Sequence, residues 1–377
     1  MDFTPLTDYL HRQLELGVPG CELIVCRDHE VLYHECAGFS DAAHTRPAQP
    51  QDRYFIYSCT KPLTVTCAMQ CLERGLFQLD DPVDVYLPAF KNVYLMRDGR
   101  RCPPQTRMTL RHLFTMTAGL DYDLRSQPIL DTLARLGDAA TTQDIVNALP
   151  EKPLCFEPGS RYQYSLCHDV LGAVIEVVSG MTLRDYMQKN LFAPLHMDRT
   201  DFYRPGMPCP DLAVQVGYDA GKVVPYPAKN EFVPTPHYFS GGAGVVSCAT
   251  DYAQFVDTLA CGESAQGVRI LQKPTIDLLR SEQLHDFSAA GVFTCTCGPD
   301  YGYGLGVRTR IAFNEGAPSS LGEFGWDGAA GMDMLIDPEH RISFVFIEHM
   351  RGWPALQGAI HLQIRDLLYP ILSEVLD

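Results

Sequence analysis

The feature that most constrains this 377-residue chain is an apolar segment over residues 59–74. Its hydrophobic residues occupy most sides of a helical projection, which is typical of a helix buried on all faces. Pro62 is compatible with such a helix only in the first turn, where amides lack intrahelical acceptors. The helix therefore begins near Ser58 and ends at Gly75. Hydrophobic residues make up 46% of the chain, which can supply the sizeable core that such a helix needs.

Ser58 and Lys61 stand three residues apart at the start of this helix, in the sequence Ser58-Cys59-Thr60-Lys61. Positions i and i+3 share one helix face, so the hydroxyl and the amine can meet. Partial desolvation lowers the pKa of a lysine, which can then take a proton from the serine. The positive end of the helix dipole also favours a serine alkoxide. The tetrapeptide alone is weak evidence, although no other serine here has a lysine three residues later.

The net charge of −16 predicts a surface that repels nucleic acid and anionic membranes. We therefore expect neither as a partner. No stretch reaches the ~18 apolar residues needed to cross a bilayer. The first residues lack the basic and apolar regions of a secretory signal, which predicts a cytoplasmic protein. Fourteen cysteines in mostly apolar contexts fit a reducing compartment.

Neither a metal nor an organic cofactor is expected from the motifs. Cys295 and Cys297 form the only close pair of cysteines, and they have neither the two-residue spacer nor the second cluster of a zinc site. We interpret them as loop thiols. The chain also lacks the Gly-x-Ser-x-Gly elbow, the His-Glu-x-x-His zinc motif, the Walker loop and the dinucleotide fingerprint.

Strand-like segments at both ends of the chain enclose a helical middle. A predicted helix over residues 5–16 precedes two strands, 21–26 and 31–36, that form a hairpin. Residues 80–220 are rich in short helical patterns, and a helix at 250–260 follows the glycine-rich segment 241–244. Further strands are predicted at 304–309, 331–336 and 342–347, before a closing helix at 356–375. Loops are expected near 120–140, 200–240 and 285–300.

These patterns predict an α/β (α+β) fold with an antiparallel sheet built from the N- and C-terminal segments and flanked by helices. A mostly helical region is inserted between them. We expect one catalytic unit over residues 1–377, with 1–60 and 220–377 forming a sheet subdomain and 61–219 a helical subdomain. The active site should lie at their interface.

Two further segments are candidates to join the serine. The phenol of Tyr164 can act as a general acid or base, although a packed aromatic residue with a bonded hydroxyl is the alternative. The glycine-rich segment 324–331 contains Trp326, Asp327 and Gly328, and its glycines allow backbone to approach a ligand closely. The alternative for this segment is a plain hairpin. Asp327 is either a pocket carboxylate or a turn residue.

In this order, Ser58-x-x-Lys61, Tyr164-Ser165, a Thr-Ala-Gly segment at 117–119 and the glycine-rich strand resemble the serine beta-lactamase and penicillin-binding superfamily. The closest branch is the class C beta-lactamase-like esterases. The resemblance runs from about residue 10 to 370 and implies a beta-lactamase-like fold.

The resemblance also implies roles for individual residues. Ser58 stands at the position of the nucleophile, Lys61 and Tyr164 form the proton-transfer pair, and the backbone amides of Ser58 and Ala329 form the oxyanion hole. It places four residues in the substrate pocket: Trp326, Asp327, Gly328 and Leu166.

Two departures from the family pattern bear on the substrate. The second motif usually ends in asparagine, whose side chain binds a lactam amide, but here Leu166 offers no hydrogen bond. The third motif of beta-lactamases is Lys-Thr-Gly, whereas Trp326 is uncharged and Asp327 is anionic. Both changes disfavour penicillin-type or D-Ala-D-Ala substrates and favour a neutral, partly apolar ester.

We therefore predict a serine hydrolase that acts on a small-molecule carboxylic ester through an acyl-enzyme on Ser58. An acyltransferase, a beta-lactamase or D-Ala-type peptidase, and a non-catalytic binding protein of the same fold are the alternatives. The acyl chain, the alcohol and the oligomeric state stay open.

Three other residues are weighed and set aside. His168 is more consistent with a capping or core residue than with a site residue. His349 ends a predicted strand, where a minority of such residues line a pocket. Cys59 is predicted to be a small core residue.

Overall fold

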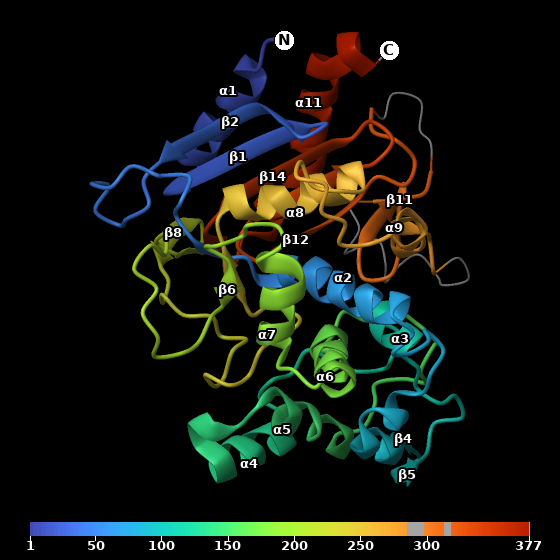
Figure 1. Ribbon diagram of the computed structural model, residues 1–377. Coiled ribbons are helices and arrows are strands. Elements are labelled where there is room, and N and C mark those ends of the chain that lie inside the picture. Colours follow the sequence, from blue (N-terminus) through green and yellow to red (C-terminus); the bar gives the residue numbers. More distant parts are fainter. Residues whose placement is uncertain (285–297, 313–317, 377) are drawn as a thin grey trace.

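The computed structural model describes residues 1–284, 298–312 and 318–376 (Figure 1). Its main sheet is antiparallel and combines strands from both ends of the chain, as predicted from the sequence. In spatial order its seven strands are β10 (Tyr301–Tyr303), β11 (Arg308–Arg310), β12 (Phe324–Asp327), β13 (Asp333–Asp337), β14 (Ile342–Glu348), β1 (Gly20–Arg27) and β2 (Glu30–Gly38).

The hairpin β1–β2 forms where the sequence predicts it. Asp28 and His29 at its turn have φ of 52° and 69°, the left-handed values that a tight hairpin turn requires at both central positions. Strand β1 then pairs with β14 on its other side, from Cys21 opposite Glu348 to Arg27 opposite Ile342. The hydrophobic residues of the first strand are therefore joined to those of the last long strand.

Alternate residues of the central strands pack into two separate cores, one on each face of the sheet. Leu23 and Val25 face the core under α1 (Thr4–Glu15) and α11 (Ile360–Leu376), which lie side by side. Ile24 and Cys26 face the opposite core, which includes α8 (Ala249–Cys261) and α2 (Thr60–Glu73). Figure 1 shows α2 lying between the sheet and the helices of the inserted region.

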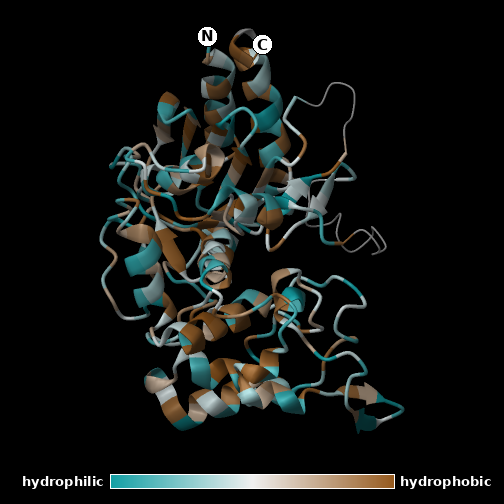
Figure 2. Cartoon of the chain, turned by 45° about the vertical axis from the view of Figure 1, so that its right-hand side comes forward, coloured by the Kyte–Doolittle hydropathy of each residue, from teal (hydrophilic) through white to brown (hydrophobic). Residues whose placement is uncertain are grey.

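Short helices make up most of the inserted region, and brown hydrophobic positions are frequent in them (Figure 2). The α-helices are α3 (Leu110–Phe114), α4 (Gln127–Leu136), α5 (Thr142–Val146), α6 (Cys167–Ser179) and α7 (Leu183–Met187); α9 (Lys273–Arg280) and α10 (Pro354–Gln357) follow later in the chain. The described chain also has the single-turn or short helices η1 (Tyr57–Cys59), η2 (Val83–Val85), η3 (Pro88–Asn92), η4 (Gly137–Ala139), η5 (Leu149–Glu151) and η6 (Gln188–Phe192).

Three small sheets complete the described part of the chain. Their strands are β3 (Tyr54–Phe55), β9 (Val245–Ser247) and β6 (Asp201–Phe202) in one; β15 (Met350–Arg351), β7 (Val216–Asp219) and β8 (Lys222–Pro225) in the second; and β4 (Leu95–Arg97) with β5 (Arg100–Cys102) in the third. The hairpin β7–β8 spans residue 220, where the sequence places a subdomain boundary. The division into two subdomains stays a prediction.

Two segments differ from the sequence-based expectation. The strand predicted at 304–309 is wrong over residues 304–307, because β10 ends at Tyr303 and β11 begins at Arg308. Gly306 has φ of 87°, and a Cβ on Gly304 would lie 2.3 Å from the carbonyl oxygen of Leu279, so these glycines form a tight connection instead. The loop expected at 120–140 contains α4.

The pair Cys295 and Cys297 lies outside the described residues. Within the described ranges, every helix is too short or too polar to cross a membrane.

Candidate active site

Helix α2 and the turn before it position Ser58 and Lys61. The single turn η1 contains Ser58, and α2 follows directly, with Thr60 to Cys71 buried on every side as the sequence predicts. Tyr57 has φ of 45°, a left-handed conformation that costs energy for a residue with a side chain. The Tyr57 side chain is held in place by a hydrogen bond that its hydroxyl donates to Gln215 Oε1 at 2.5 Å. The backbone is thus strained directly before the serine.

The structure brings Ser58, Lys61 and Tyr164 together. Lys61 Nζ donates to Ser58 Oγ at 3.1 Å, and the Tyr164 hydroxyl donates to the same oxygen at 2.7 Å. Ser58 is partly exposed, whereas Lys61 is fully buried. A partly exposed serine is thus contacted by two proton-carrying groups.

Aromatic rings support the Tyr164 hydroxyl. Its ring stacks between those of Tyr122 and Trp326, with centroid distances of 5.5 and 5.9 Å. Trp326 Nε1 donates to Tyr164 Oη at 3.3 Å, and Lys61 Nζ lies 4.5 Å from the centre of the Tyr164 ring. An indole donor and a nearby ammonium both stabilise negative charge on the phenolic oxygen.

Lys61 has two further acceptors that hold its amine in place. Its Nζ donates to the carbonyl oxygen of Gly242 at 2.6 Å and to Tyr122 Oη at 3.2 Å. The Gly242 segment is fixed by buried Asp169, which accepts hydrogen bonds from Tyr238 and Ser240 at 2.8 and 2.6 Å. Burial raises the pKa of Asp169. A Cβ on Gly242 would lie 2.6 Å from Asp169 Oδ2, so a larger residue here would displace the Asp169 carboxylate.

The residues 328–331 form a tight turn (the 328–331 turn) between β12 and β13. The Gly331 amide donates to the Gly328 carbonyl at 2.9 Å, and a Cβ on Gly328 would lie 2.5 Å from the carbonyl oxygen of Ile56. Glycine at position 328 therefore lets the turn pack against the segment that leads into Ser58. The amide of Ala329 donates no hydrogen bond to another described residue.

The carbonyl of Ala329 is anchored from two sides. Arg351 Nη1 donates to it at 2.9 Å and Gln357 Nε2 at 3.1 Å. Arg351 also pairs with Glu231 and lies 4.5 Å from the centre of the Tyr57 ring. One arginine thus contacts both the 328–331 turn and the strained residue before Ser58.

Two residues predicted to line the substrate pocket have buried side chains. Leu166 is 1% exposed and belongs to the core, because it precedes the buried helix α6. Trp326 is 2% exposed and packs behind Tyr164, so its indole supports the tyrosine and offers almost no surface to a substrate.

Asp327 lies at the end of β12, opposite Asp333. It is half-buried, and burial, followed by the charge of Asp333, raises its pKa to about 6. It is thus a strand residue beside a second carboxylate, a setting that neither of the two sequence interpretations included.

Sequence reasoning missed Tyr122, Gly242 and Arg351. Tyr122 follows the Thr-Ala-Gly segment by three residues, and no motif marks it. The glycines at 241–244 are visible in the sequence, but their contact with Lys61 joins residues 181 positions apart. Arg351 follows the last long strand, and its link to Ala329 depends on how that strand meets β12 and β13.

The core contains His168 and Cys59, as predicted from the sequence. It also contains His349. His168 Nε2 lies 3.3 Å from the Phe114 carbonyl oxygen. His349 donates from Nδ1 to the Ala213 carbonyl at 3.0 Å and accepts the Phe55 amide at Nε2 at 3.3 Å. The neutral ring of His349 therefore ties strand β3 in place just before Ser58.

The buried histidines predict a pH dependence of stability. Burial lowers the pKa of His349 to about 4 and that of His168 to about 3, below the ~6.5 of an unfolded chain. Between these values the unfolded state binds more protons, so stability is fully present above pH ~6.5 and is lost as the pH falls toward 4. For one such histidine the loss from pH 7 to 5 is about 2 kcal/mol.

The matching variant is His349→Gln, whose amide can donate to Ala213 and accept from Phe55 as the neutral ring does. Urea unfolding at pH 7 and pH 5 should show a smaller loss of unfolding free energy in this variant than in the parent. Equal losses in the two proteins would contradict the assignment of this pH dependence to His349.

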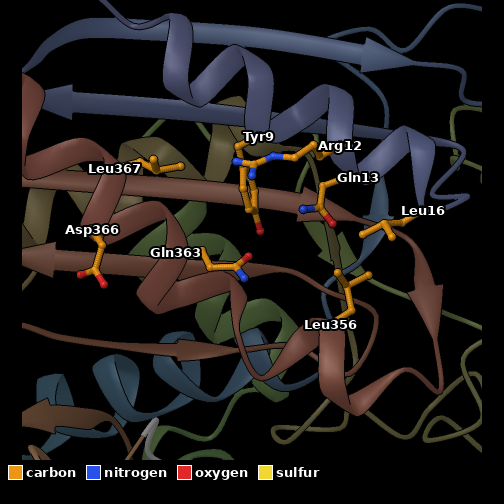
Figure 3. A pocket seen from close by; sticks show the side chains of 8 residues that line it. All are labelled: Tyr9, Arg12, Gln13, Leu16, Leu356, Gln363, Asp366 and Leu367. Carbon is orange, nitrogen blue, oxygen red and sulfur yellow. The ribbon is translucent and has the colours of Figure 1, made fainter.

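The described residues also enclose a cavity of about 490 Å³ between α1 and α11. Tyr9, Gln13 and Gln363 point into it, and leucines from both helices and α10 line its sides (Figure 3). It lies on the face of the sheet opposite α2, so it is separate from the Ser58 site.

The fold and the cluster around Ser58 agree with the comparisons to known proteins. A family model described as Beta-lactamase matches residues 6–366. The chain belongs to the beta-lactamase family. The beta-lactamase-like fold expected from the sequence is thereby confirmed.

Among relatives, the Esterase EstB of Burkholderia gladioli is 28% identical over 379 residues, which cover 94% of this chain and 92% of that protein. The Acyltransferase mokF of Monascus pilosus is 28% identical over 70% of this chain and 66% of its own length. Among solved structures, that of EstCE1, described as a hydrolase with promiscuous acyltransferase activity, has a TM-score of 0.80 and 29% identity, covering 97% and 98% of the two chains. Simvastatin synthase (LovD) from Aspergillus terreus shares the fold, with a TM-score of 0.80 at 22% identity over 98% of both chains.

Proposed function

We propose that this protein is a serine hydrolase that cleaves carboxylic esters through an acyl-enzyme on Ser58. The observation that carries the proposal is the convergence of Lys61 Nζ and Tyr164 Oη on the hydroxyl oxygen of one partly exposed serine. A hydroxyl becomes a nucleophile when an adjacent base takes its proton, and both groups are within the distance for that transfer. The similarity to Esterase EstB and to EstCE1 supports an ester as the substrate class.

In the acylation step, Ser58 Oγ attacks the ester carbonyl carbon and its proton passes to the Lys61–Tyr164 pair. The two groups are coupled through Ser58 and through the contact of Lys61 with the Tyr164 ring, so the proton belongs to the pair and not to one member. The tetrahedral intermediate then collapses, the C–O bond to the alcohol breaks, and Tyr164 protonates the departing oxygen. Water attacks the acyl-enzyme by the reverse proton path and releases the acid.

The amides of Ser58 and Ala329 are proposed to bind the carbonyl oxygen as it becomes negative. Support comes from the first-turn position of Ser58, from the 328–331 turn packed against Ile56, and from the Ala329 amide, which has no described acceptor. Removing one such donor typically costs ~10²–10³ in rate.

The same geometry favours a neutral substrate. The residues described next to Ser58 supply aromatic surface from Tyr122 and Tyr164, and the nearby guanidinium of Arg351 is already paired with Glu231. Lys61 is buried and bonded to Gly242. A substrate carboxylate would thus meet no unengaged cation among these groups.

Labelling with a fluorophosphonate probe, followed by peptide mapping, tests the proposal. We expect modification of the peptide that contains Ser58, because only an activated serine reacts. Loss of labelling in Ser58→Ala, with labelling kept in Ser160→Ala, would assign the reaction to Ser58. A parent protein that is not labelled, and that turns over no aryl ester, would instead support the non-catalytic binding protein.

Arg351 offers a test of the oxyanion hole that leaves the proton-transfer residues intact. In Arg351→Lys the positive charge stays, but one amine cannot bond both Ala329 and Glu231 in the fork geometry of a guanidinium. We expect kcat for an aryl ester to fall about tenfold, less than for loss of a donor itself, with little change in KM. Arg341→Lys, which alters an ion pair with Asp28 on the surface, is the matched control. A kcat within twofold of the parent would separate Arg351 from catalysis.

Acyl transfer to an alcohol or amine is the second candidate function. The printed description of EstCE1 and the similarity to Acyltransferase mokF favour it. Product analysis with and without an alcohol acceptor distinguishes the two, since a transferase forms the new ester faster than the free acid. A beta-lactamase or peptidase activity is disfavoured because Leu166 and Trp326 replace the asparagine and the lysine of the family pattern, so that the amide and the charge they supply are missing. A chromogenic lactam that stays intact would agree with that.

A further inference from the structure

The edge hairpin β1–β2 brings together three side chains of the kinds that bind zinc. Glu22 on β1 lies directly opposite Cys36 on β2, and His34 is two residues before Cys36. Alternate residues of a strand share one face, and cross-strand partners are immediate neighbours on that face. We propose that Glu22, His34 and Cys36 form a binding site for Zn²⁺, distinct from the Ser58 site.

The distances fit a single metal ion. One donor atom from each of the three residues lies within 4.8 Å of the other two, and His34 Nε2 is 2.7 Å from Glu22 Oε1. Zinc bonds of ~2.0–2.3 Å place tetrahedral ligands roughly 3.3–3.8 Å apart. Small side-chain adjustments therefore suffice, and the strands need not move.

The chemistry of the three donors also fits. A thiolate, an imidazole and a carboxylate are all ordinary zinc ligands, and three protein ligands leave a fourth position for water. Because β2 is the edge strand of the sheet and the His34 side chain is 27% exposed, an ion can enter from the side.

Charge favours a cation at this place. Glu22 is fully buried, and within the described ranges its ion-pair contact is with His34 alone, without an arginine or lysine. A buried carboxylate that lacks a strong cation is costly unless a positive ion joins it. The nearby carboxylate of Asp52 is already paired with Arg46, at 3.1 Å.

A second group of potential ligands, Asp28, His29 and Cys261, lacks this demand for a cation. Asp28 lies 2.6 Å from Arg341, and His29 Nδ1 lies 2.7 Å from Asp257. The carboxylate of Asp28 is thus already matched, and its side chain is 61% exposed. This group therefore serves as the control.

Titration of the chelator-treated full chain with Zn²⁺, and separately with Co²⁺, tests the proposal. We expect about one equivalent of Zn²⁺ to bind, and Co²⁺ to give a near-ultraviolet thiolate charge-transfer absorption. Cys36→Ser should remove that absorption, and His34→Gln should weaken Zn²⁺ binding at least tenfold. The matched controls Cys102→Ser and His29→Gln should change neither the cobalt absorption nor the affinity for Zn²⁺.

Because the side chain of His34 is partly exposed, His34→Gln should fold even if Cys36→Ser does not, and circular dichroism verifies this. A parent that binds no Zn²⁺ at micromolar concentration would overturn the proposal. Retention of parental affinity in His34→Gln, or of the cobalt absorption in Cys36→Ser, would also overturn it. Esterase activity is not a readout here, so the two proposals fail independently.

Discussion

Replacing Ser58 by alanine should abolish hydrolysis of a short-chain aryl ester and leave the melting temperature close to that of the parent. The substitution removes the one oxygen to which Lys61 Nζ and Tyr164 Oη both donate, so no nucleophile remains. The side chain is small and partly exposed, so little buried surface is lost. The Lys61 amine and the Tyr164 hydroxyl left behind keep other contacts, with the Gly242 carbonyl and with Trp326 Nε1.

Initial rates with an aryl acetate, together with thermal unfolding, measure the two expectations. Ser160→Ala, at an exposed serine outside the site, is the control for nonspecific effects of losing a hydroxyl. Parental turnover in Ser58→Ala would remove Ser58 from the reaction. A large drop in melting temperature would leave the loss of rate without a catalytic meaning.

The second large effect is expected for Tyr164→Phe, which should lower kcat/KM by ~10²–10⁴, the range for a general acid–base group. Phenylalanine keeps the ring between Tyr122 and Trp326, so packing is preserved while the oxygen that reaches Ser58 is lost. The proton then has no short path to the leaving alcohol.

Tyr122→Phe provides the matched control for this prediction. Its hydroxyl contacts Lys61 at 3.2 Å, and Tyr164 is the ring that reaches Ser58, so we expect a clearly smaller loss for Tyr122→Phe. A decrease below threefold in Tyr164→Phe would reduce Tyr164 to a packing role. A pH–rate profile adds a readout that packing alone would not move, because removal of one member of a coupled pair changes the profile's shape.

Local patterns predicted much of the fold. The all-round apolar helix with Pro62 in its first turn, the hairpin β1–β2 and the long strand β14 each depend on residues close in sequence. The strand predicted at 304–309 is partly wrong, because Gly304 and Gly306 are compatible with a tight connection as well as with a strand. The chain forms a tight connection here because Gly304 packs closely against the Leu279 carbonyl. That contact joins residues 25 positions apart, so local patterns do not predict it.

In the candidate site, too, some contacts follow from the local sequence and others depend on tertiary packing. Ser58 and Lys61 are neighbours on one helix, so their contact follows from helical periodicity alone. Leu166 and Trp326, in contrast, were assigned to the pocket by their place beside motif residues, yet both side chains are buried. A position in a motif fixes the course of the backbone, and the direction of each side chain depends on what packs around it.

The sequence by itself determined a buried helix that begins at a serine, a lysine one turn later, and a sheet made from both chain ends. The helix and its lysine follow from periodicity and from the steric limits of proline and glycine, which act over a few residues, and the sheet follows from strand patterns at both ends of the chain with helical patterns between them. Only the tertiary structure decided that Tyr122, Gly242 and Arg351 contact the residues around that serine. Such contacts join residues far apart in the chain, and they exist only after both cores have closed on the two faces of the sheet.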